Sequence, residues 1–221
     1  MIATGVSSQY LKYENSRDSL NVVLSFVHCC SAGGVMHDTY SVDERRLPWP
    51  NLTLLSRQHE FPTADTTSGK VKEHYKHSYR KRKFSAFKGI PYIKPILEYL
   101  RLEEPQNPDS WSVVFEATKT HNCIQKFATF PLNGNEDCVY LNVYVPRYQP
   151  ISGENLDVIV YVHGGAFISG NPDSDGSGFL MDQDIVYVSI NYRIGIFGFL
   201  SSGDDEIPGN YDLKDHVFTL K

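Results

Sequence analysis

The spacing of apolar residues predicts several strands in the second half of the chain. From Val139 to Val145, apolar side chains alternate with polar or aromatic ones, which is typical of a half-buried strand. Residues 158–162 and 185–190 are instead nearly continuous runs of apolar, mostly β-branched side chains. Such runs indicate strands that are buried on both faces. We therefore expect both runs in the centre of an α/β sheet.

Two further patterns predict a hairpin and a helix. Residues 67–75 and 83–92 are rich in β-forming residues and flank a polar, basic stretch, which indicates an antiparallel hairpin with a solvated tip. Leu213, Val217 and Leu220 recur at helical spacing. We expect a helix to begin there and to be cut off in mid-course by the end of the chain.

The first 62 residues show no sustained period of either kind. We interpret residues 1–62 as leader and linker and residues 63–221 as part of one folded domain. Residues 20–32 are too short and too polar to span a bilayer. Residues 20–34 resemble the apolar part and small-residue end of a secretory signal, and the alternative is an extension without that role. Asn51 begins an Asn-Leu-Thr glycosylation sequon, which is usable only in a secreted chain.

Composition and charge narrow the classes of function. The net charge of −5 and the pI near 5.9 argue against a general affinity for nucleic acid. Four cysteines fall into an adjacent pair, Cys29 and Cys30, and a separated pair, Cys123 and Cys138. The separated pair is compatible with a disulfide or with two buried thiols. The histidines show no metal-ligand spacing, so we expect no metal site.

The most informative motif follows the first buried run. His163, Gly164, Gly165, Ala166 and Phe167 come directly after Val162. Glycine has no Cβ to block an approaching group, so its backbone amides can hold the oxygen of a tetrahedral intermediate in acyl transfer. The alternative is a tight strand-to-loop turn without catalytic meaning.

This motif and several others, taken in their order along the chain, resemble the type-B carboxylesterase family. The resemblance covers roughly residues 66–221, and it is greatest to insect carboxylesterases and to juvenile-hormone-esterase-like or cholinesterase-like members. The matching segments are Phe87-Lys88-Gly89-Ile90-Pro91-Tyr92, Trp111, residues 135–144, His163-Gly164-Gly165-Ala166-Phe167, Asn191-Tyr192-Arg193, Gly198-Phe199-Leu200 and Pro208-Gly209-Asn210-Tyr211.

The resemblance implies an α/β-hydrolase fold, incomplete here, with the N-terminal hairpin and the first strands of the central sheet. It implies that Gly164 and Gly165 supply two oxyanion-hole amides, with a third just after the nucleophile. It also implies a Cys123–Cys138 disulfide and, with it, a secreted or luminal location, although a cytoplasmic one stays open. The expected partner is a small hydrophobic ester, and the chemistry requires no cofactor.

The catalytic serine motif of this fold is missing from the 221 residues. None of the serines has glycine both two residues before and two residues after it, as the Gly-x-Ser-x-Gly elbow requires. We therefore expect a fragment that lacks the catalytic triad, is inactive alone and is prone to aggregate. His163 belongs to the glycine motif and is not expected to replace the catalytic base. Glu136 and Asp137 are expected to be structural.

The sequence also departs from the family at positions where the resemblance leads us to expect glycine. These positions are Glu73, Lys81, Glu98, Val113 and Asp212. Ile93 and Ile96 replace an expected alanine and proline. The leading hypothesis is a serine-dependent carboxylic ester hydrolase with an acyl-enzyme intermediate. The alternative is a non-catalytic, cholinesterase-like binding or adhesion protein, or a degenerate remnant.

Overall fold

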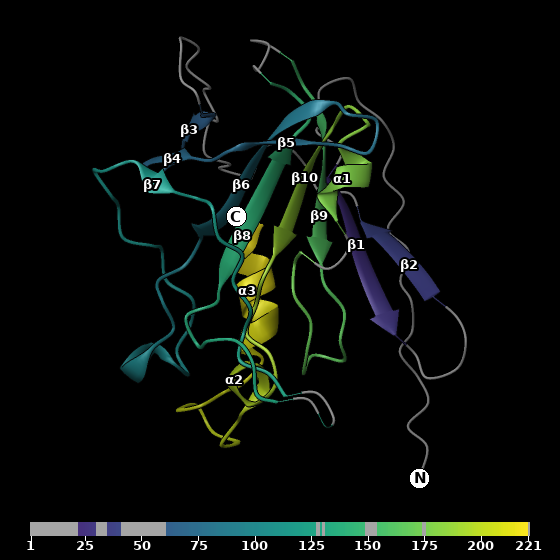
Figure 1. Cartoon of the computed structure of the whole chain (residues 1–221). Coiled ribbons are helices and arrows are strands. Elements are labelled where there is room, and N and C mark those ends of the chain that lie inside the picture. The colour runs from purple at the N-terminus through teal and green to yellow at the C-terminus, as the bar shows by residue number, and fades with distance from the viewer. Residues whose placement is uncertain are drawn as a thin grey trace.

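A seven-stranded mixed sheet forms the centre of the molecule (Figure 1). The computed structural model describes residues 61–126, 129, 131–148, 154–173 and 176–220 in full, and residues 22–29 and 35–40 by their backbone. The strands of this sheet are β1 (Val22–Cys29), β2 (Val35–Tyr40), β5 (Tyr75–His77), β6 (Lys83–Pro91), β8 (Tyr140–Val145), β9 (Asp157–Val162) and β10 (Ile185–Ile190). Their order across the sheet is β2-β1-β9-β10-β8-β6-β5.

A smaller sheet and short helices complete the described residues. The small sheet has the order β3-β4-β7. Its strands are β3 (Thr63–Asp65), β4 (Lys70–Lys72) and β7 (Phe115–Glu116), and the helices are α1 (Ser177–Leu180), α2 (Ile196–Phe199), α3 (Tyr211–Thr219) and a 3-10 helix at Glu98–Leu100. In the part of the chain that the structure describes, no helix has the length and apolarity needed to cross a membrane.

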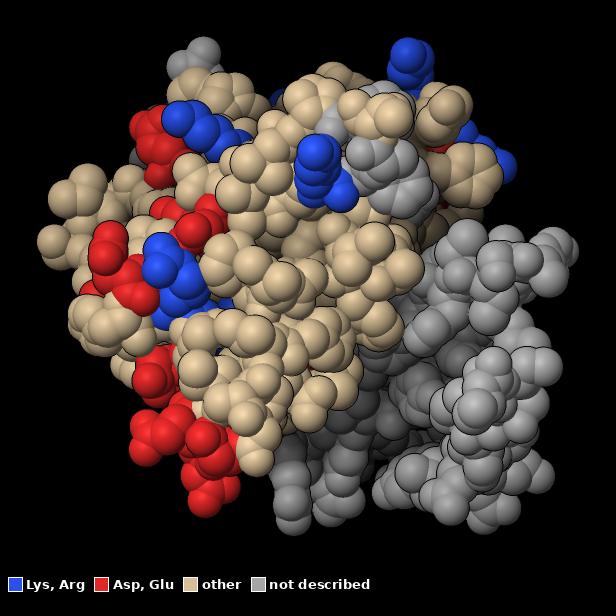
Figure 2. Space-filling model, turned by 90° about the horizontal axis from the view of Figure 1, so that it is seen from below, with Lys and Arg blue, Asp and Glu red and all other residues tan. Residues whose placement is uncertain are grey.

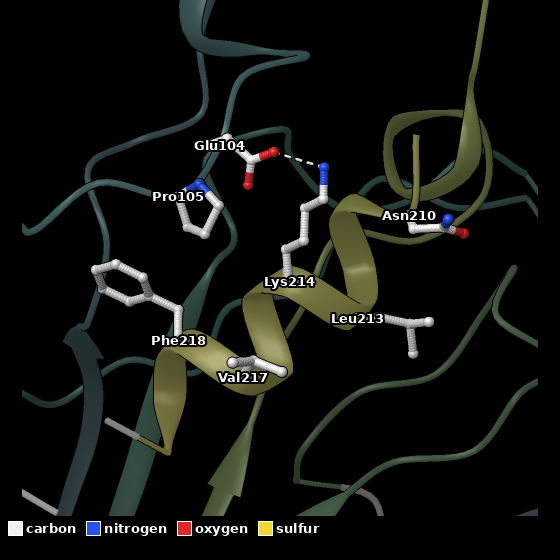
Figure 3. A pocket seen from close by; sticks show the side chains of 7 residues that line it. All are labelled: Glu104, Pro105, Asn210, Leu213, Lys214, Val217 and Phe218. Atoms are coloured by element: carbon white, nitrogen blue, oxygen red, sulfur yellow. Dashed lines mark hydrogen bonds and ion pairs between the residues drawn. The ribbon is translucent and has the colours of Figure 1, made fainter. Parts of the chain in front are cut away.

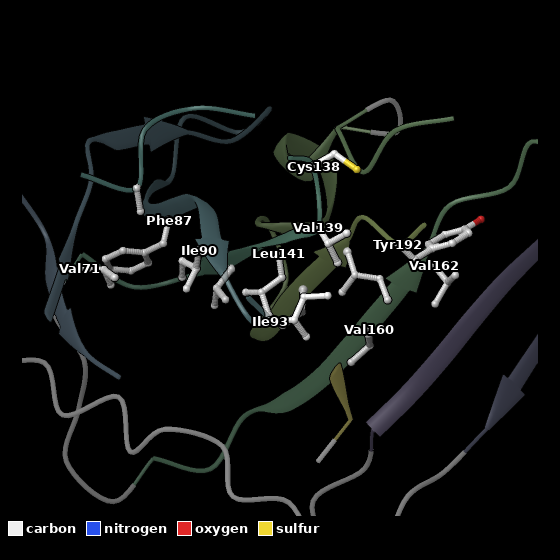
Figure 4. Close-up of a cluster of buried hydrophobic side chains, with 14 of the residues drawn as sticks. Val71, Phe87, Ile90, Ile93, Cys138, Val139, Leu141, Val160, Val162 and Tyr192 are labelled. Atoms are coloured by element: carbon white, nitrogen blue, oxygen red, sulfur yellow. The ribbon is translucent and has the colours of Figure 1, made fainter. Parts of the chain in front are cut away.

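The two continuous apolar runs form the parallel centre of the large sheet, as predicted. Strands β9 and β10 pair in parallel, with Val158 opposite Val186 and Val162 opposite Ile190. Side chains from the sheet contribute to two separate buried clusters, the larger of which is shown in Figure 4. Val160, Val162 and Ile190 belong to this larger cluster. The ends of both strands that lead into the following loops are the most deeply buried.

Strand β8 is more deeply buried than its alternating pattern suggests. The prediction of a half-buried strand is wrong here, because Asn142 and Tyr144 are buried as well as the alternating valines. The reason is its position: β8 lies between β10 and β6 and is antiparallel to both. The Asn142 side chain is satisfied there, since its Oδ1 accepts from the Gly89 amide at 2.9 Å and its Nδ2 donates to Ser189.

The predicted hairpin is present but shorter than expected. Tyr75 pairs with Ser85 and His77 with Lys83, so β5 and the start of β6 form an antiparallel hairpin. Residues 70–72, which we had placed on the same strand, instead form β4 of the small sheet. The tip is exposed at Tyr79. The outcome supports the solvated hairpin tip that the basic stretch predicted.

Helix α3 forms where predicted, but two of its apolar residues are exposed. Leu213 is 48% exposed and Val217 is 56% exposed. The buried side chains are Tyr211, Asp212, Asp215, His216 and Thr219. Only Phe218 and Leu220, both partly buried, pack against the larger cluster. The periodicity thus identified the helix correctly, although two of the three residues that carry it, Leu213 and Val217, are exposed.

The segment interpreted as leader contains two strands of the large sheet. Strand β1 pairs in parallel with β9, with Val22 opposite Val158 and Phe26 opposite Val162, and β2 pairs antiparallel with β1. The absence of a sustained period in the first 62 residues therefore did not exclude strands at 22–29 and 35–40. The β-branched residues of the first of these strands suit an extended backbone, and β9 offers it an unpaired edge. The division at residue 62 stays a prediction.

Candidate active site

The glycine motif forms a tight loop at the end of β9. We call residues 163–170 the glycine loop. The carbonyl of Gly165 accepts hydrogen bonds from the amides of Ile168 and Ser169, both at 3.1 Å. Gly165 has φ +127°, and a Cβ added there would lie 1.8 Å from the carbonyl oxygen of Ser169. The turn therefore requires glycine at this position.

Two amides of this loop are left without an acceptor. Within the described residues, the backbone N–H groups of Gly164 and Gly165 donate no hydrogen bond, although both glycine carbonyls accept one. Both predicted oxyanion residues thus lie together at the carboxyl end of a central parallel strand. Chemically, such amides can donate to an oxygen that gains negative charge.

The start of the loop is fixed by aromatic stacking. The His163 ring stacks on Tyr192, with ring centroids 4.5 Å apart and an interplanar angle of 21°. The Tyr192 hydroxyl donates to the His163 carbonyl at 2.6 Å. His163 is therefore buried and held against Tyr192 at the start of the loop.

The middle of the loop is fixed by the segment that precedes α2. The amide of Gly195 donates to the Phe167 carbonyl at 2.6 Å, and the ring of Phe167 meets that of Phe199 edge-on at 5.3 Å. Ala166 and Phe167 both have positive φ, at 54° and 60°. These values lie in the left-handed region, which non-glycine residues occupy at a cost of about 1 kcal/mol.

Exposed apolar side chains lie on the loop and on the α2 segment that contacts it. They are Phe167, Ile168, Ile196, Phe199 and Leu200. Figure 2 views the molecule from the end at which α2 lies in Figure 1, and its middle is mostly free of charged residues. Acidic side chains gather to one side of this face (Figure 2). Apolar side chains are therefore exposed both on the glycine loop and on the segment that contacts it.

A disulfide joins Cys123 to Cys138, as the family resemblance implied. Their Cα atoms are 4.8 Å apart. Glu136 forms an ion pair with Arg101 at 2.7 Å, and the Asp137 carboxylate accepts a hydrogen bond from the Tyr140 hydroxyl at 2.7 Å. These contacts give both acidic residues structural partners. Burial and the Asp137 carboxylate both raise the pKa of Tyr140.

Behind the glycine loop, helix α3 carries a buried ionic pair that the sequence did not reveal. Arg193 and Asp215 are both fully buried, and their side chains meet in two bonds of 2.7 and 2.9 Å. The Arg193 guanidinium also donates to the Glu103 carbonyl. The sequence signal was weak, because Arg193 stands in a matched motif while Asp215 is a single acid in a helix.

Asp212 and His216 lie on the same buried face of the helix. Asp212 is 0% exposed, and neither of its carboxylate oxygens has a hydrogen-bond partner in the described residues. Burial raises the pKa of Asp212 to about 6, and burial lowers the pKa of His216 to about 4. The rings of Tyr192 and His216 meet edge-on at 4.3 Å. Tyr192 thus contacts the glycine loop and the helix.

A separate hollow on α3 contains no residue of the glycine loop. It has a volume of about 340 Å³ (Figure 3). Its lining consists of Glu104, Pro105, Asn210, Leu213, Lys214, Val217 and Phe218. We do not place ester chemistry there. No group of three or more potential metal ligands occurs among the described residues, and Asn51 lies outside them.

The parallel pair β9 and β10 within a mixed sheet, with a glycine turn at the carboxyl end of β9, defines the class as an α/β hydrolase. Residues 60–221 match the model of the carboxylesterase family, and the chain belongs to that family.

Individual relatives match the same part of the chain. The chain is 42% identical over 179 residues to a juvenile hormone esterase of Tribolium castaneum, with 78% of this chain and 30% of the relative covered. It is 39% identical over 166 residues to esterase FE4 of Myzus persicae, with 72% and 29% covered. The crystal structure of juvenile hormone esterase from Manduca sexta, with OTFP covalently attached, matches with TM-score 0.66 and 31% identity, covering 72% of this chain and 32% of that one. The chain spans about a third of the length of these relatives.

Proposed function

We propose that this chain supplies the oxyanion-binding part of a carboxylic ester hydrolase. The observation that carries the proposal is the pair of amides at Gly164 and Gly165, which have no acceptor among the described residues. They lie in a turn that only glycine can make at position 165. Membership of the carboxylesterase family supports ester hydrolysis as the reaction.

The proposed chemistry is acyl transfer in two steps. A serine hydroxyl attacks the ester carbonyl, and negative charge develops on the carbonyl oxygen, where the two amides donate to it. The intermediate collapses to an acyl-enzyme and releases the alcohol, and water then releases the acid by the same route. No serine among the 221 residues has the flanking glycines of the nucleophile elbow. We therefore propose that the serine, acid and histidine come from further sequence and that residues 1–221 alone are inactive.

We propose a small hydrophobic ester as the substrate class. The exposed apolar side chains around the glycine loop, including Phe167 and Ile196, support this choice. An apolar ester gains from removing such surface from water. The Cys123–Cys138 disulfide supports a secreted or luminal location. A signal role for residues 20–34 and glycosylation at Asn51 stay predictions.

The test begins with the transcript across the Lys221 codon, followed by expression of the complete open reading frame. If the frame contains a Gly-x-Ser-x-Gly elbow, the product should hydrolyse 4-nitrophenyl butyrate, whereas residues 1–221 alone should not. Gly164→Pro removes one amide donor and should lower kcat by about a hundredfold or more. Gly164→Ala keeps the amide and is the matched control. Equal rates for the two variants would contradict the oxyanion role.

A second candidate function is binding without turnover, as in a non-catalytic or degenerate family member. Its support comes from the positions where glycine was expected. Lys81 and Glu98 have positive φ, at 67° and 51°, so a side chain is strained there. Glu73 and Asp212 are buried carboxylates, with unbonded oxygens among the described residues. A reading frame that stops after Lys221, with retention of the ester but no hydrolysis, would favour this function over the first.

A further inference from the structure

The side chain of Gln125 makes a two-way contact with the end of the glycine loop. Its Oε1 accepts from the Gly170 amide at 2.8 Å, and its Nε2 donates to the Gly170 carbonyl at 2.8 Å. The same Nε2 donates to the Cys123 carbonyl at 3.0 Å. A primary amide is the side-chain group that can accept from N–H and donate to C=O of one residue at once.

Gly170 lies against the start of the same loop. A Cβ added at Gly170 would lie 2.3 Å from both the Gly164 carbonyl oxygen and Nδ1 of His163. Nδ1 of His163 in turn lies 3.0 Å from the Gly164 carbonyl oxygen. The two ends of the loop are thus in close contact, so a movement of Gly170 displaces the peptide that precedes the Gly165 amide.

Gln125 is itself held in a rigid frame. Its backbone amide and carbonyl both bond to Asn133, at 2.8 and 3.0 Å. The neighbouring Ile124 amide donates to Asn135 at 3.0 Å, and Cys123, two residues away, is bonded to Cys138. The disulfide and this short ladder therefore fix the backbone from which the Gln125 side chain reaches the loop.

We infer that Gln125 is a positioning residue that holds the Gly164 and Gly165 amides in the orientation of an oxyanion hole. The inference rests on the proposed function of the glycine loop. Gln125 acts through Gly170, and it links the disulfide to the two amide donors.

The variant Gln125→Glu separates positioning from general stability. A neutral carboxylic acid has one O–H donor and one acceptor oxygen, so it can replace both contacts with Gly170. An ionised carboxylate only accepts, and its second oxygen then opposes the carbonyls of Gly170 and Cys123. In this one variant, the contacts with Gly170 should therefore be made at low pH and weakened at high pH.

The experiment is amide hydrogen exchange by NMR on the product of the complete open reading frame, with wild type and Gln125→Glu at about pH 3.5 and about pH 7.5, on either side of an ordinary glutamate pKa. At the higher pH, the amides of Ile168, Ser169 and Gly170 should exchange about tenfold faster or more in the variant, because two hydrogen bonds are lost. The Gly164 and Gly165 amide chemical shifts should move with them. At the lower pH, protection and shifts should return to those of wild type at the same pH.

The control is Gln183→Glu, which changes an exposed glutamine to the same residue type. It should leave the loop amides unchanged at both pH values. Equal protection in Gln125→Glu and wild type at the higher pH would overturn the inference, as would a loss of protection spread through β9 and β10. If the variant does not fold at the higher pH, Gln125→Asn, which keeps the amide but shortens its reach, supplies the same comparison without a charge.

The two proposals fail in different ways. If the exchange result is as expected but Gly164→Pro and Gly164→Ala hydrolyse esters equally, Gln125 holds the loop and the oxyanion function is wrong. If Gly164→Pro lowers the rate but Gln125→Glu leaves exchange unchanged, the oxyanion function stands and the role of Gln125 is wrong.

Discussion

The glycine loop and helix α3 both contact Tyr192 and are held in contrasting ways. The loop is fixed by backbone hydrogen bonds, by the Gln125 amide and by the stacked ring of His163, and the first two are contacts between neutral groups. The helix buries three ionisable side chains, of which Asp215 is matched by Arg193. Asp212 has no such partner in the described residues.

The contrast shows which of the two regions should depend on pH. Contacts between neutral groups are nearly independent of pH, whereas a buried carboxylate changes its charge with pH and its free energy with it. The hydrogen bonds between backbone groups of the loop, and those to the Gln125 amide, should therefore change little with pH. Helix α3, which contacts Tyr192 through His216, should not keep the same stability as the pH changes.

The largest expected effect comes from breaking the buried ion pair between Asp215 of α3 and Arg193. Asp215→Asn leaves the Arg193 guanidinium buried without a counter-charge, and it should lower the free energy of unfolding by about 3–5 kcal/mol. Urea unfolding measures this. Glu104→Gln removes the surface partner of Lys214 on the same helix, an ion pair with side chains 29% and 62% exposed, and should cost less than about 1 kcal/mol. Similar losses in both variants would show that the buried pair is not the main anchor of α3.

An intermediate effect on stability is expected at Asp212, whose carboxylate has no hydrogen-bond partner in the described residues. Because the folded-state pKa of Asp212 is raised to about 6 from an ordinary 3.8, its contribution to stability is fully present below about pH 4 and is lost as the pH rises through 6. Asp212→Asn, which stays neutral, should be more stable than wild type at pH 7, on the order of 2–3 kcal/mol, and similar to it near pH 4.

Urea unfolding of both proteins across this pH range measures the difference. Asp205→Asn, at an exposed carboxylate of the preceding loop, is the control and should show a much smaller pH-dependent change. A constant difference between Asp212→Asn and wild type from pH 4 to pH 7 would show that Asp212 is not the titrating group.

The smallest effect is expected in the loop. Ala166 has φ 54°, so Ala166→Gly should relieve strain and stabilise the protein by no more than about 1 kcal/mol, equally at pH 4 and pH 7. Ala86→Gly, at a buried position in strand β6, should have the opposite sign, because glycine weakens a strand and removes buried surface. Thermal unfolding at the two pH values distinguishes them. If the stability gained by Ala166→Gly differed between pH 4 and pH 7, the loop would depend on pH as the helix does, contrary to the prediction.

The sequence predicted those elements that depend on residues close together along the chain. The runs at 158–162 and 185–190 gave two adjacent parallel strands, because continuous burial leaves an unambiguous signature. The glycines at 164 and 165 indicated a loop in the sequence. The structure gives the reason at position 165, where the backbone φ and the nearby Ser169 carbonyl leave no room for a side chain. The Cys123–Cys138 bridge came from the family resemblance, since spacing alone left free thiols equally open.

Features set by distant partners could not be predicted in the same way. The orientation of α3 depends on the pairing of Asp215 with Arg193, 22 residues away, which outweighs the exposure of Leu213 and Val217. The role of Gln125 depends on Gly170, 45 residues away, and no local pattern marks that contact. The depth of β8 depends on neighbours on both sides. In each case the decisive contact is long-range.

The parallel pairing of β1 with β9 has a consequence for maturation of the protein. Residues 22–29 lie within the segment proposed as a secretory signal, and a signal is removed in the mature protein. Cleavage after that segment would take β1 away and leave the outer edge of β9, directly beside the glycine loop, open to another strand. Residues 22–29 can therefore either be removed as part of a signal or remain in the sheet as β1, but not both. The N-terminal sequence of the mature protein distinguishes these two outcomes.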